Sequence, residues 1–530
     1  MTSREYFLRP NVLLEPLVDR WYAWPHLIPP ATAARNISER HLRIMDSYIN
    51  APDAHAAAVK NRKLLGGPFM EFGGSKVEEV KRLRETTRSK RGHLLALSQA
   101  IGELDELLRN EATGHTLQGL YERVPEPLQG YVKLVYDLNN HPSFRLLEPL
   151  LYRSRYYDRS MQSLMLSAID RDERSFVLST PRLDDDRSIE WRLPFESKDL
   201  DRLYALRTRP APYPAIKDLL DVPDDRDGLL FNLLTEEPPR SYASYDGPGA
   251  RWRYFGHACI LLEFRGLSIL LDPVLSYSYD TNISRYTYDD LPAKIDFALI
   301  THNHQDHILF ETLLQLRLRI RNIVVPRNVS GALQDPSLKL MLQNCGFHNV
   351  IEVSDMEELT FDSASITTLP FLGEHGDLNI ASKAAYLVRV NGHSLLFAAD
   401  SCNVSPSVYK NVHSAIGDIE VLFLGMECDG APLSWIYGPL LTQKLERAKD
   451  HSRRLAGSDY GRAIRMVEQF RCQEVYVYAM GQEPWLNHVM RVKYTDESRP
   501  IVESNRLIAT CGDRGIVAER LFGEKELFLS

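Results

Sequence analysis

Two different patterns of hydrophobic and polar positions divide this chain. Over residues 75–110, leucine and isoleucine side chains recur every three or four positions, as at Leu97 and Ile101, which is the spacing of one face of a helix. Ser75 followed by Glu78 matches the capping box that opens many helices. We therefore expect a mostly helical first half, with some strand in an α+β arrangement.

A stretch rich in helix- and strand-breaking residues follows this first half. Between about Thr235 and Ala250 the chain reads Glu-Glu-Pro-Pro-Arg-Ser-Tyr-Ala-Ser-Tyr-Asp-Gly-Pro-Gly, which favours a linker. Beyond it, short β-branched and apolar runs alternate with turns and with a helical pattern over 461–470. The expected strands are 260–264, 268–271, 297–301, 322–325, 365–369, 385–390, 394–398, 421–424 and 475–478. We expect one domain over 1–240 and a layered α/β domain over 250–530.

Length and composition agree with this division and exclude some classes of function. A chain of 530 residues is long for one domain. Its 63 Lys and Arg against 71 Asp and Glu give a formal net charge of −8, which argues against a binder of duplex nucleic acid. The six Cys residues have no CxxC spacing, which favours reduced thiols over disulfides or a zinc finger. Neither a signal-peptide pattern nor an apolar run of about 20 residues is visible. We therefore expect a cytoplasmic protein without a membrane partner.

Three histidines and one aspartate directly follow one of the expected strands. The segment reads Asp296-Phe-Ala-Leu-Ile-Thr-His302-Asn-His304-Gln-Asp306-His307. A loop at the end of a strand can project His302 and His304 to one side and turn Asp306 and His307 toward a neighbouring point, giving ligands for two adjacent metal ions. A lone histidine is more often a structural hydrogen-bonding residue. Four such residues at this spacing predict a two-metal site.

This HxHxDH pattern resembles the metal-binding motif of the metallo-β-lactamase superfamily. The similarity extends upstream to Tyr-Phe-Gly-His257 and to the turn Asp272-Pro273, which look like the opening hairpin and the following turn of that fold. Downstream, an apolar strand ending at Asp400 is similar to the one that carries the family's metal-bridging aspartate. The resemblance covers about residues 250–490. It implies an αββα sandwich in the C-terminal half, after the mostly helical α+β domain.

One turn departs from the pattern of the hydrolases in that superfamily. Where they place a fourth histidine, this chain has Gly-Glu374-His375-Gly, and either Glu374 or His375 could occupy the ligand position. If Glu374 does, the first metal gains two histidines and one carboxylate, the facial arrangement of non-haem iron sites. With Asp306 and Asp400 the metals then have three carboxylates, which stabilise oxidised iron.

The last histidine of the family pattern is displaced as well. The chain has Met480 or Gly481 where that histidine is expected, and His488 lies a short loop farther on. His488 is our candidate ligand for the second metal, with Glu483 as its competitor and an exposed loop histidine as the ordinary alternative. His257 suits a hydrogen bond to a ligand better than metal ligation.

Other residues near the motif are weaker candidates. Glu427, Cys428 and Asp429 follow an expected strand, where they either line the mouth of the site or form a plain turn. Cys402 suits a buried thiol better than a metal ligand, because a thiolate beside an oxidising centre is easily damaged.

With these departures, the chain resembles one branch of the superfamily, the di-iron β-hydroxylases of antibiotic biosynthesis by nonribosomal peptide synthesis. The resemblance implies two iron ions joined by an oxo or hydroxo bridge, and oxygen-dependent hydroxylation at the β-carbon of an aminoacyl group. That group is held as a thioester on a peptidyl carrier domain. The implied ligands are His302, His304 and Glu374 for the first iron and Asp306, His307 and His488 for the second, with Asp400 bridging. Glu374 and Asp400 are also the expected catalytic residues.

The same reaction implies partners for the chain. One oxygen atom enters the substrate and the other becomes water, so each turnover needs two external electrons. Because no flavin or nicotinamide fingerprint is visible, we expect an electron-donating reductase. The helical first half has apolar faces but no ligand cluster, which favours docking and formation of a homodimer.

A hydrolase is the alternative enzyme. In a two-zinc lactonase or phosphodiesterase, a metal-bridging hydroxide attacks a carbonyl or phosphoryl centre, and the ligand set is nearly the same. Glu374 and the missing terminal histidine count against this alternative. A carrier-docking module without activity is disfavoured, because a decayed site would not be expected to keep the whole HxHxDH set.

Overall fold

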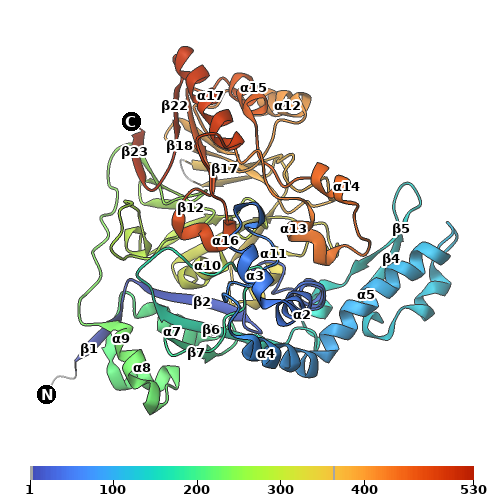
Figure 1. Ribbon diagram of the computed structural model, residues 1–530. Coiled ribbons are helices and arrows are strands. Elements are labelled where there is room, and N and C mark those ends of the chain that lie inside the picture. Colours follow the sequence, from blue (N-terminus) through green and yellow to red (C-terminus); the bar gives the residue numbers. More distant parts are fainter. Residues whose placement is uncertain (1–3, 362–363, 530) are drawn as a thin grey trace.

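Within the described residues, the N-terminal half combines nine short strands with helices, and it precedes a larger sandwich of two sheets (Figure 1). The computed structural model describes residues 4–361 and 364–529. In the first half, a four-stranded antiparallel sheet has the order β3-β2-β6-β7 and a three-stranded sheet the order β8-β1-β9, while β4 and β5 form a hairpin. The strands are β1 (Glu5–Leu8), β2 (Val12–Val18), β3 (Trp21–Tyr22), β4 (Val132–Tyr136), β5 (Pro142–Leu146), β6 (Gln162–Ala168), β7 (Ser188–Arg192), β8 (Ala211–Pro212) and β9 (Leu234–Thr235).

The helices of this half are α1 (Pro30–Asn36), α2 (Leu42–Asn50), α3 (Pro52–Ala58), α4 (Val77–Lys90), α5 (Gly92–Glu111), α6 (Glu148–Leu151), α7 (Lys198–Ala205), α8 (Tyr213–Leu220) and α9 (Asp227–Asn232). Among them, α5 extends away from the four-stranded sheet toward the β4–β5 hairpin, while α8 and α9 lie at the opposite end beside β1 (Figure 1).

The helix expected over 75–110 is divided into α4 and α5. The two helices meet at Arg91, whose guanidinium lies 3.1 Å from a carboxylate oxygen of Asp19 and 2.7 Å from one of Asp158. These ion pairs hold Arg91 outside helical geometry. The predicted capping box is wrong, because the Ser75 hydroxyl donates to the carbonyl of Phe72 at 2.6 Å and α4 begins two residues later without a side-chain cap.

Two seven-stranded sheets form the C-terminal half, and their orders are β15-β14-β13-β12-β11-β10-β23 and β16-β17-β18-β19-β20-β21-β22. Each of the nine expected strands overlaps one of these. The strands are β10 (Ala250–Tyr254), β11 (Ile260–Phe264), β12 (Leu267–Leu271), β13 (Ile295–Leu299), β14 (Ile320–Pro326), β15 (Val350–Val353), β16 (Glu358–Phe361), β17 (Ala364–Leu369), β18 (Ala385–Val390), β19 (His393–Phe397), β20 (Val421–Gly425), β21 (Glu474–Tyr478), β22 (Val517–Arg520) and β23 (Lys525–Leu529).

The two sheets face each other across an aromatic core. The ring of Trp252 on β10 lies 5.1 Å from that of Phe423 on β20 and 4.9 Å from that of Tyr476 on β21. Helices α12 (Pro406–Ile416), α15 (Tyr460–Phe470) and α17 (Arg499–Asp513) cover the outer face of the second sheet (Figure 1). The remaining helices are α10 (Phe310–Leu316), α11 (Leu338–Asn344), α13 (Ser434–Tyr437), α14 (Arg447–Ser452) and α16 (Asn487–Met490). This arrangement confirms the predicted αββα sandwich.

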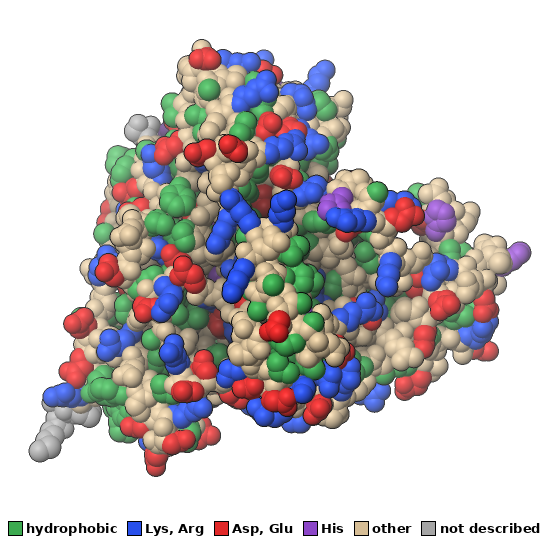
Figure 2. Space-filling view, in the orientation of Figure 1, with side chains coloured by type: hydrophobic (Ala, Val, Ile, Leu, Met, Phe, Trp, Pro, Cys, Tyr) green, Lys and Arg blue, Asp and Glu red, His purple; other side chains and the backbone are tan. Residues whose placement is uncertain are grey.

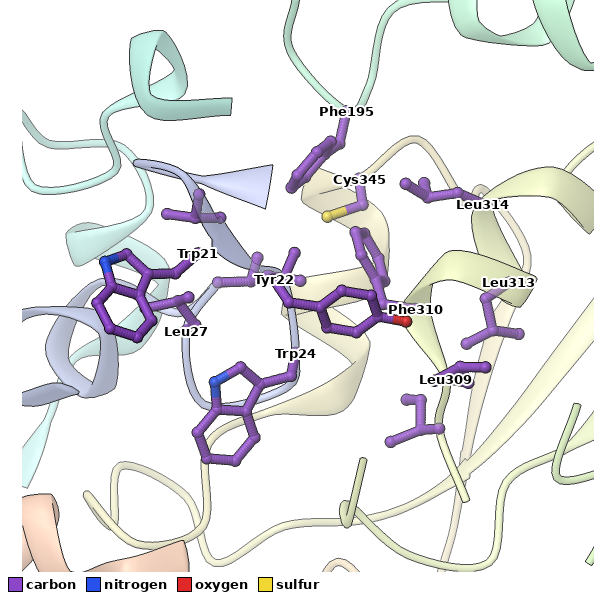
Figure 3. Packing of buried hydrophobic residues seen from close by; sticks show 14 of the residues in the cluster. Trp21, Tyr22, Trp24, Leu27, Phe195, Leu309, Phe310, Leu313, Leu314 and Cys345 are labelled. Atoms are coloured by element: carbon purple, nitrogen blue, oxygen red, sulfur yellow. The ribbon is translucent and has the colours of Figure 1, made fainter. Parts of the chain in front are cut away.

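The N-terminal half packs directly on α10, at the outer face of the first sheet. Figure 3 shows Tyr22 and Phe195 of that half against Phe310 and the leucines of α10, and the rings of Phe195 and Phe310 are 5.2 Å apart. At the polar centre of this contact, the buried carboxylate of Glu311 accepts hydrogen bonds from Tyr22 at 3.0 Å and from Arg174 at 2.6 Å. One continuous core therefore fixes the two halves relative to each other. No helix in the described part of the chain is long and apolar enough to cross a membrane.

Candidate metal centre

The predicted ligands come together at one edge of the sandwich, where strands of both sheets end. His302 to His307 follow β13 of the first sheet, while Glu374 follows β17 and Asp400 follows β19 of the second. Their donor atoms form three overlapping groups within which all atoms lie within 4.8 Å of one another. The groups are His302, His304, Glu374 and His375; His257, Asp306 and His307; and His302, His307 and Asp400.

The first group places one carboxylate between two imidazoles. Glu374 Oε1 lies 2.9 Å from His304 Nδ1, and Glu374 Oε2 lies 2.8 Å from His375 Nδ1. His302 completes the group, with its ring 4.8 Å from that of His304. The structure thus brings both alternatives of the Gly-Glu-His-Gly turn, Glu374 and His375, into the same group.

Asp400 lies between the first and the second group. Its Oδ2 atom is 3.7 Å from His302 Nε2 and 3.1 Å from His307 Nε2. His307 Nε2 in turn lies 3.7 Å from a carboxylate oxygen of Asp306. A carboxylate that faces one histidine of each group has the position that a bridging ligand requires.

Hydrogen bonds behind the cluster determine which ring nitrogens keep a free lone pair. Asp272 accepts from Thr301 Oγ1 at 2.7 Å and from His307 Nδ1 at 2.8 Å. Because the Thr301 hydroxyl donates its proton to Asp272, its oxygen accepts from His302 Nδ1 at 3.0 Å. Both histidines therefore carry a proton at Nδ1, which leaves Nε2, the nitrogen that faces Asp400, as the atom available to a metal. Such outer partners orient metal-binding histidines.

A tyrosine from helix α13, far from His304 in sequence, has the same effect on that histidine. The Tyr437 hydroxyl lies 2.9 Å from His304 Nε2, on the side of the ring away from Glu374. If Nε2–H donates to Tyr437, the Nδ1 lone pair of His304 is free on the side of Glu374 and His302. Tyr437 is fully buried, so this contact also closes the site to water.

The hydrogen bonds of His257 favour the role expected from the sequence. The backbone N–H of Gly481 can only donate, and it donates to His257 Nδ1 at 3.2 Å. His257 Nε2 therefore carries a proton, and it lies 3.1 Å from a carboxylate oxygen of Asp306. A ring nitrogen that donates to a ligand is not itself a metal ligand, so His257 supports Asp306.

Several donor atoms in the cluster lack a hydrogen-bond partner among the described residues. They are buried, and they include His302 Nε2 and Asp400 Oδ1. Burial and the neighbouring imidazoles hold the pKa of His302 well below its ordinary value, so its ring is neutral. Unpaired buried polar atoms are costly unless something binds them. Neutral imidazoles and carboxylates are the ligands of non-haem iron, so these residues fit two metal ions.

The chain adopts an unusual backbone conformation where it enters the site. His257, Asp272 and Glu374 have φ angles of 52°, 37° and 65°, and Ala399, just before Asp400, has 43°. Such left-handed conformations are disfavoured for residues with a side chain and concentrate at functional sites. Their recurrence at four strand ends indicates that these turns are shaped to direct side chains into the cluster.

The structure places neither His488 nor Glu483 in any of the three groups. His488 lies on α16, where its ring contacts that of Tyr22 at a distance of 5.9 Å and its carbonyl accepts from the N–H of Val177 at 3.0 Å. The Glu483 carboxylate instead accepts a hydrogen bond from the Tyr254 hydroxyl. Because α16 packs onto the N-terminal half, the chain turns away from the metals there, and we leave both residues out of the proposed ligand set.

Two further residues border the cluster, and one of them could not be expected from sequence. His26 of the N-terminal half is fully buried, with its ring 5.7 Å from that of Tyr437, and neither ring nitrogen has a hydrogen bond to a described residue. Burial and the nearby His304 lower the pKa of His26 to about 3. Glu427, one of the weaker sequence candidates, also lies close, since burial and the charges of Asp400 and Asp306 raise its pKa well above the ordinary value.

Cys402 is a buried thiol, as the sequence predicted. It is 1% exposed, and its Sγ lies 3.3 Å from the carbonyl oxygen of Ala456. Burial raises the pKa of Cys402 to about 12, which keeps the sulfur protonated and unreactive.

Comparisons with known proteins agree with both halves of this structure. Residues 7–238 match the family model of the diiron non-heme beta-hydroxylase N-terminal domain, and residues 268–430 match that of the beta-lactamase superfamily domain. The 3-hydroxylase of 4-amino-L-phenylalanyl-CmlP peptidyl carrier protein from Streptomyces venezuelae is 40% identical over 532 residues, which cover 99% of this chain and 100% of that protein.

Solved structures give the same result over the full length. The crystal structure of CmlA, a diiron beta-hydroxylase from Streptomyces venezuelae, superimposes with a TM-score of 0.93 at 39% identity, covering 100% of both chains. A mutant of the CmlA beta-hydroxylase superimposes with a TM-score of 0.91 at 38% identity, covering 99% of this chain and 100% of the other.

Proposed function

This chain belongs to the diiron non-heme β-hydroxylases, and we propose that it hydroxylates the β-carbon of an aminoacyl group carried as a thioester on a peptidyl carrier domain. Membership in this family makes the protein a non-haem di-iron enzyme and favours the monooxygenase over the two-zinc hydrolase. The proposed ligands are His302, His304 and Glu374 for one iron and Asp306 and His307 for the other, with Asp400 between them.

One observation supports the carrier-bound substrate above the others. The 40% identity to a hydroxylase of a carrier-bound amino acid extends over both halves of the chain, including the N-terminal half that packs against α10. The 3-position named for that relative is the β-carbon of its amino acid. We infer the same substrate class for this chain, with the side chain of the amino acid left open.

The protein's own residues orient the metals and keep the site dry. Two iron ions, when bound, supply the electrons and the activation by which one atom of dioxygen enters the substrate C–H bond and the other leaves as water. Asp272 and Thr301 keep His302 and His307 in the tautomer that binds metal. Tyr437 and His26 enclose the first group on the side of the N-terminal half and exclude water there.

Two partners follow from this proposal. A monooxygenase consumes two external electrons per turnover, so an electron-donating reductase is required. The N-terminal half is proposed to dock the carrier and to form a homodimer, because it covers the metal centre without contributing a member to any of the three donor groups.

The test of the substrate compares two forms of the same amino acid. Chemically reduced, iron-loaded protein receives dioxygen with either the free amino acid or the amino acid loaded on its carrier domain, and the products are followed by mass. A gain of one oxygen atom on the loaded carrier alone supports the proposal. Equal turnover of the free amino acid, or cleavage of the thioester without oxygen uptake, contradicts it.

A further inference from the structure

A large cavity opens between the two halves of the protein, beside the metal centre. Its volume is about 910 Å³, within the range of about 300–1,000 Å³ that is usual for ligand sites. One wall is formed by residues 59–65 after α3, and the other by residues 481–495 around α16. The Arg62 guanidinium donates to the carbonyl of Lys493 at 3.0 Å, so a contact between the halves borders the opening.

Two residues connect the wall of this cavity with the metal ligands. Gly481 lines it, and its N–H donates to His257, which in turn contacts Asp306. Tyr494 also lines it, and its hydroxyl is buried without a hydrogen-bond partner among the described residues. Burial and the charges of Glu427 and other acidic neighbours, Asp400 included, raise the pKa of Tyr494 well above its ordinary value. Gly481 and Tyr494 therefore lie between the cavity and the second metal group.

Three cations stand at the rim of this cavity. Lys60, Arg62 and Lys493 are exposed, and within the described residues none of them has a carboxylate oxygen within 4.0 Å. Of the two acidic residues in the lining, Glu483 is buried and bound to a tyrosine hydroxyl, which leaves only Glu173 exposed. In Figure 2, Lys and Arg side chains gather in the middle of the face where α3 and α16 lie in Figure 1.

We propose that this cavity admits the phosphopantetheine arm of the carrier domain, and that Lys60, Arg62 and Lys493 bind its phosphodiester at the rim. The inference rests on the proposed function, because only a carrier-bound substrate has such an arm. The arm joins a negatively charged phosphate at one end to the aminoacyl thioester at the other. With the phosphate at the cationic rim, the thioester end lies toward Tyr494 and the metals.

The charges of the protein make the rim selective. The chain as a whole carries a net charge of −8, whereas the rim holds three exposed cations without a carboxylate partner among the described residues. An exposed cation contributes little alone, but several around one anion act together and are weakened by salt. A free amino acid lacks the phosphate and gains nothing from these cations, which agrees with the predicted preference for the loaded carrier.

The test measures binding rather than turnover, with two small probes. The full-length protein is titrated with S-methyl phosphopantetheine and with S-methyl pantetheine, which lacks the phosphate. Methylation prevents the thiol from binding metal. The phosphorylated probe should bind more tightly, and its affinity should fall as salt is raised, while the other probe stays unchanged. In the triple variant K60Q/R62Q/K493Q, the affinity for the phosphorylated probe should fall about tenfold, to that of pantetheine.

A matched variant controls for a general loss of positive charge. K198Q/R209Q/K410Q removes two lysines and one arginine that are also exposed, are without a carboxylate partner among the described residues and lie outside the cavity lining. It should bind both probes as the parent does, and both triple variants should unfold at the temperature of the parent.

The outcomes separate this inference from the proposed function. Binding of the phosphorylated probe that depends on the three rim cations supports the cavity assignment, even if the parent hydroxylates no loaded carrier and the proposed function fails. Equal binding of the two probes by the parent, or unchanged selectivity in K60Q/R62Q/K493Q, overturns the cavity assignment. It does so even if the parent hydroxylates a loaded carrier.

Discussion

Asp272→Asn should weaken iron binding, although Asp272 is not one of the proposed ligands. The Asp272 carboxylate is fully buried and accepts three hydrogen bonds, from the N–H of Thr301 at 2.8 Å, from the Thr301 hydroxyl at 2.7 Å and from His307 Nδ1 at 2.8 Å. An asparagine has one accepting oxygen and an NH₂ group that can only donate. If the NH₂ group replaces the oxygen that faces the Thr301 N–H, two donors face each other. If it replaces the other oxygen, it faces His307 Nδ1 and forces His307 to carry its proton at Nε2, where the metal binds.

The size of the effect follows from this loss. Removing the outer partner of a metal-binding histidine costs about 10- to 100-fold in metal affinity, or ~1.4–2.7 kcal/mol. Because Asp272 contacts His307 directly and His302 through Thr301, both metals are affected, and the second should be affected more. Ferrous iron affinity is measured without oxygen, by competition with a chromophoric chelator.

Asp296→Asn provides a matched control for the loss of carboxylate hydrogen bonds. Asp296 on β13 accepts from the N–H of Ser268 at 3.0 Å and from the Ser268 hydroxyl at 3.2 Å, and it has no contact with the histidines of the cluster. This variant should bind iron as the parent does. If Asp272→Asn binds both equivalents of iron with the affinity of the parent, the assignment of the Nδ1 protons is wrong.

The other predictions concern the first metal, the contact between the halves and the response to pH. Glu374→Ala should lose one equivalent of iron by elemental analysis and keep the fold, whereas the same loss in His375→Ala instead would reverse the assignment within that turn. Glu311→Ala removes the buried carboxylate that pairs with Arg174 and accepts from the hydroxyls of Tyr22 and Tyr277. The free energy of unfolding, measured in urea, should fall by about 3–5 kcal/mol, and a fall of less than about 1 kcal/mol would contradict this. Burial raises the pKa of Glu148 from 4.5 to about 7. As the pH rises, the unfolded chain loses this proton near its ordinary pKa of 4.5, whereas the folded protein keeps it until about pH 7. The free energy of unfolding should therefore fall by about 3 kcal/mol between pH 4.5 and 7. This fall should be absent from Glu148→Gln, and an equal fall in both proteins would refute the shift.

The sequence predicted those parts of the site that are close together along the chain. His302, His304, Asp306 and His307 directly follow one strand, so the spacing alone predicted that they would be side by side. The strands of the sandwich were predicted equally well, because each expected strand is a short run of apolar residues, while the αββα arrangement was implied by the resemblance to the metallo-β-lactamase superfamily.

Contacts between distant segments could not be predicted in this way. Tyr437 contacts His304 and His26 contacts Tyr437, each from another part of the chain, and no motif marks either residue. His488 is near the final core strand in sequence, but α16 packs onto the N-terminal half and carries the ring toward Tyr22. One continuous helix was wrongly predicted across Arg91, because Arg91 forms its ion pairs with Asp19 and Asp158, which are far away in sequence.

The most direct test of the central claim follows the oxygen atom. Iron-loaded, chemically reduced protein reacts once with ¹⁸O₂ and an aminoacyl-loaded carrier domain in ordinary water, and the aminoacyl group is then released and analysed by mass spectrometry. We predict one ¹⁸O atom on the β-carbon, no reaction in zinc-loaded protein and an intact thioester before release. An unlabelled product, or a thioester cleaved with oxygen from water in the zinc-loaded protein, would contradict the hydroxylase and leave hydrolysis as the better explanation.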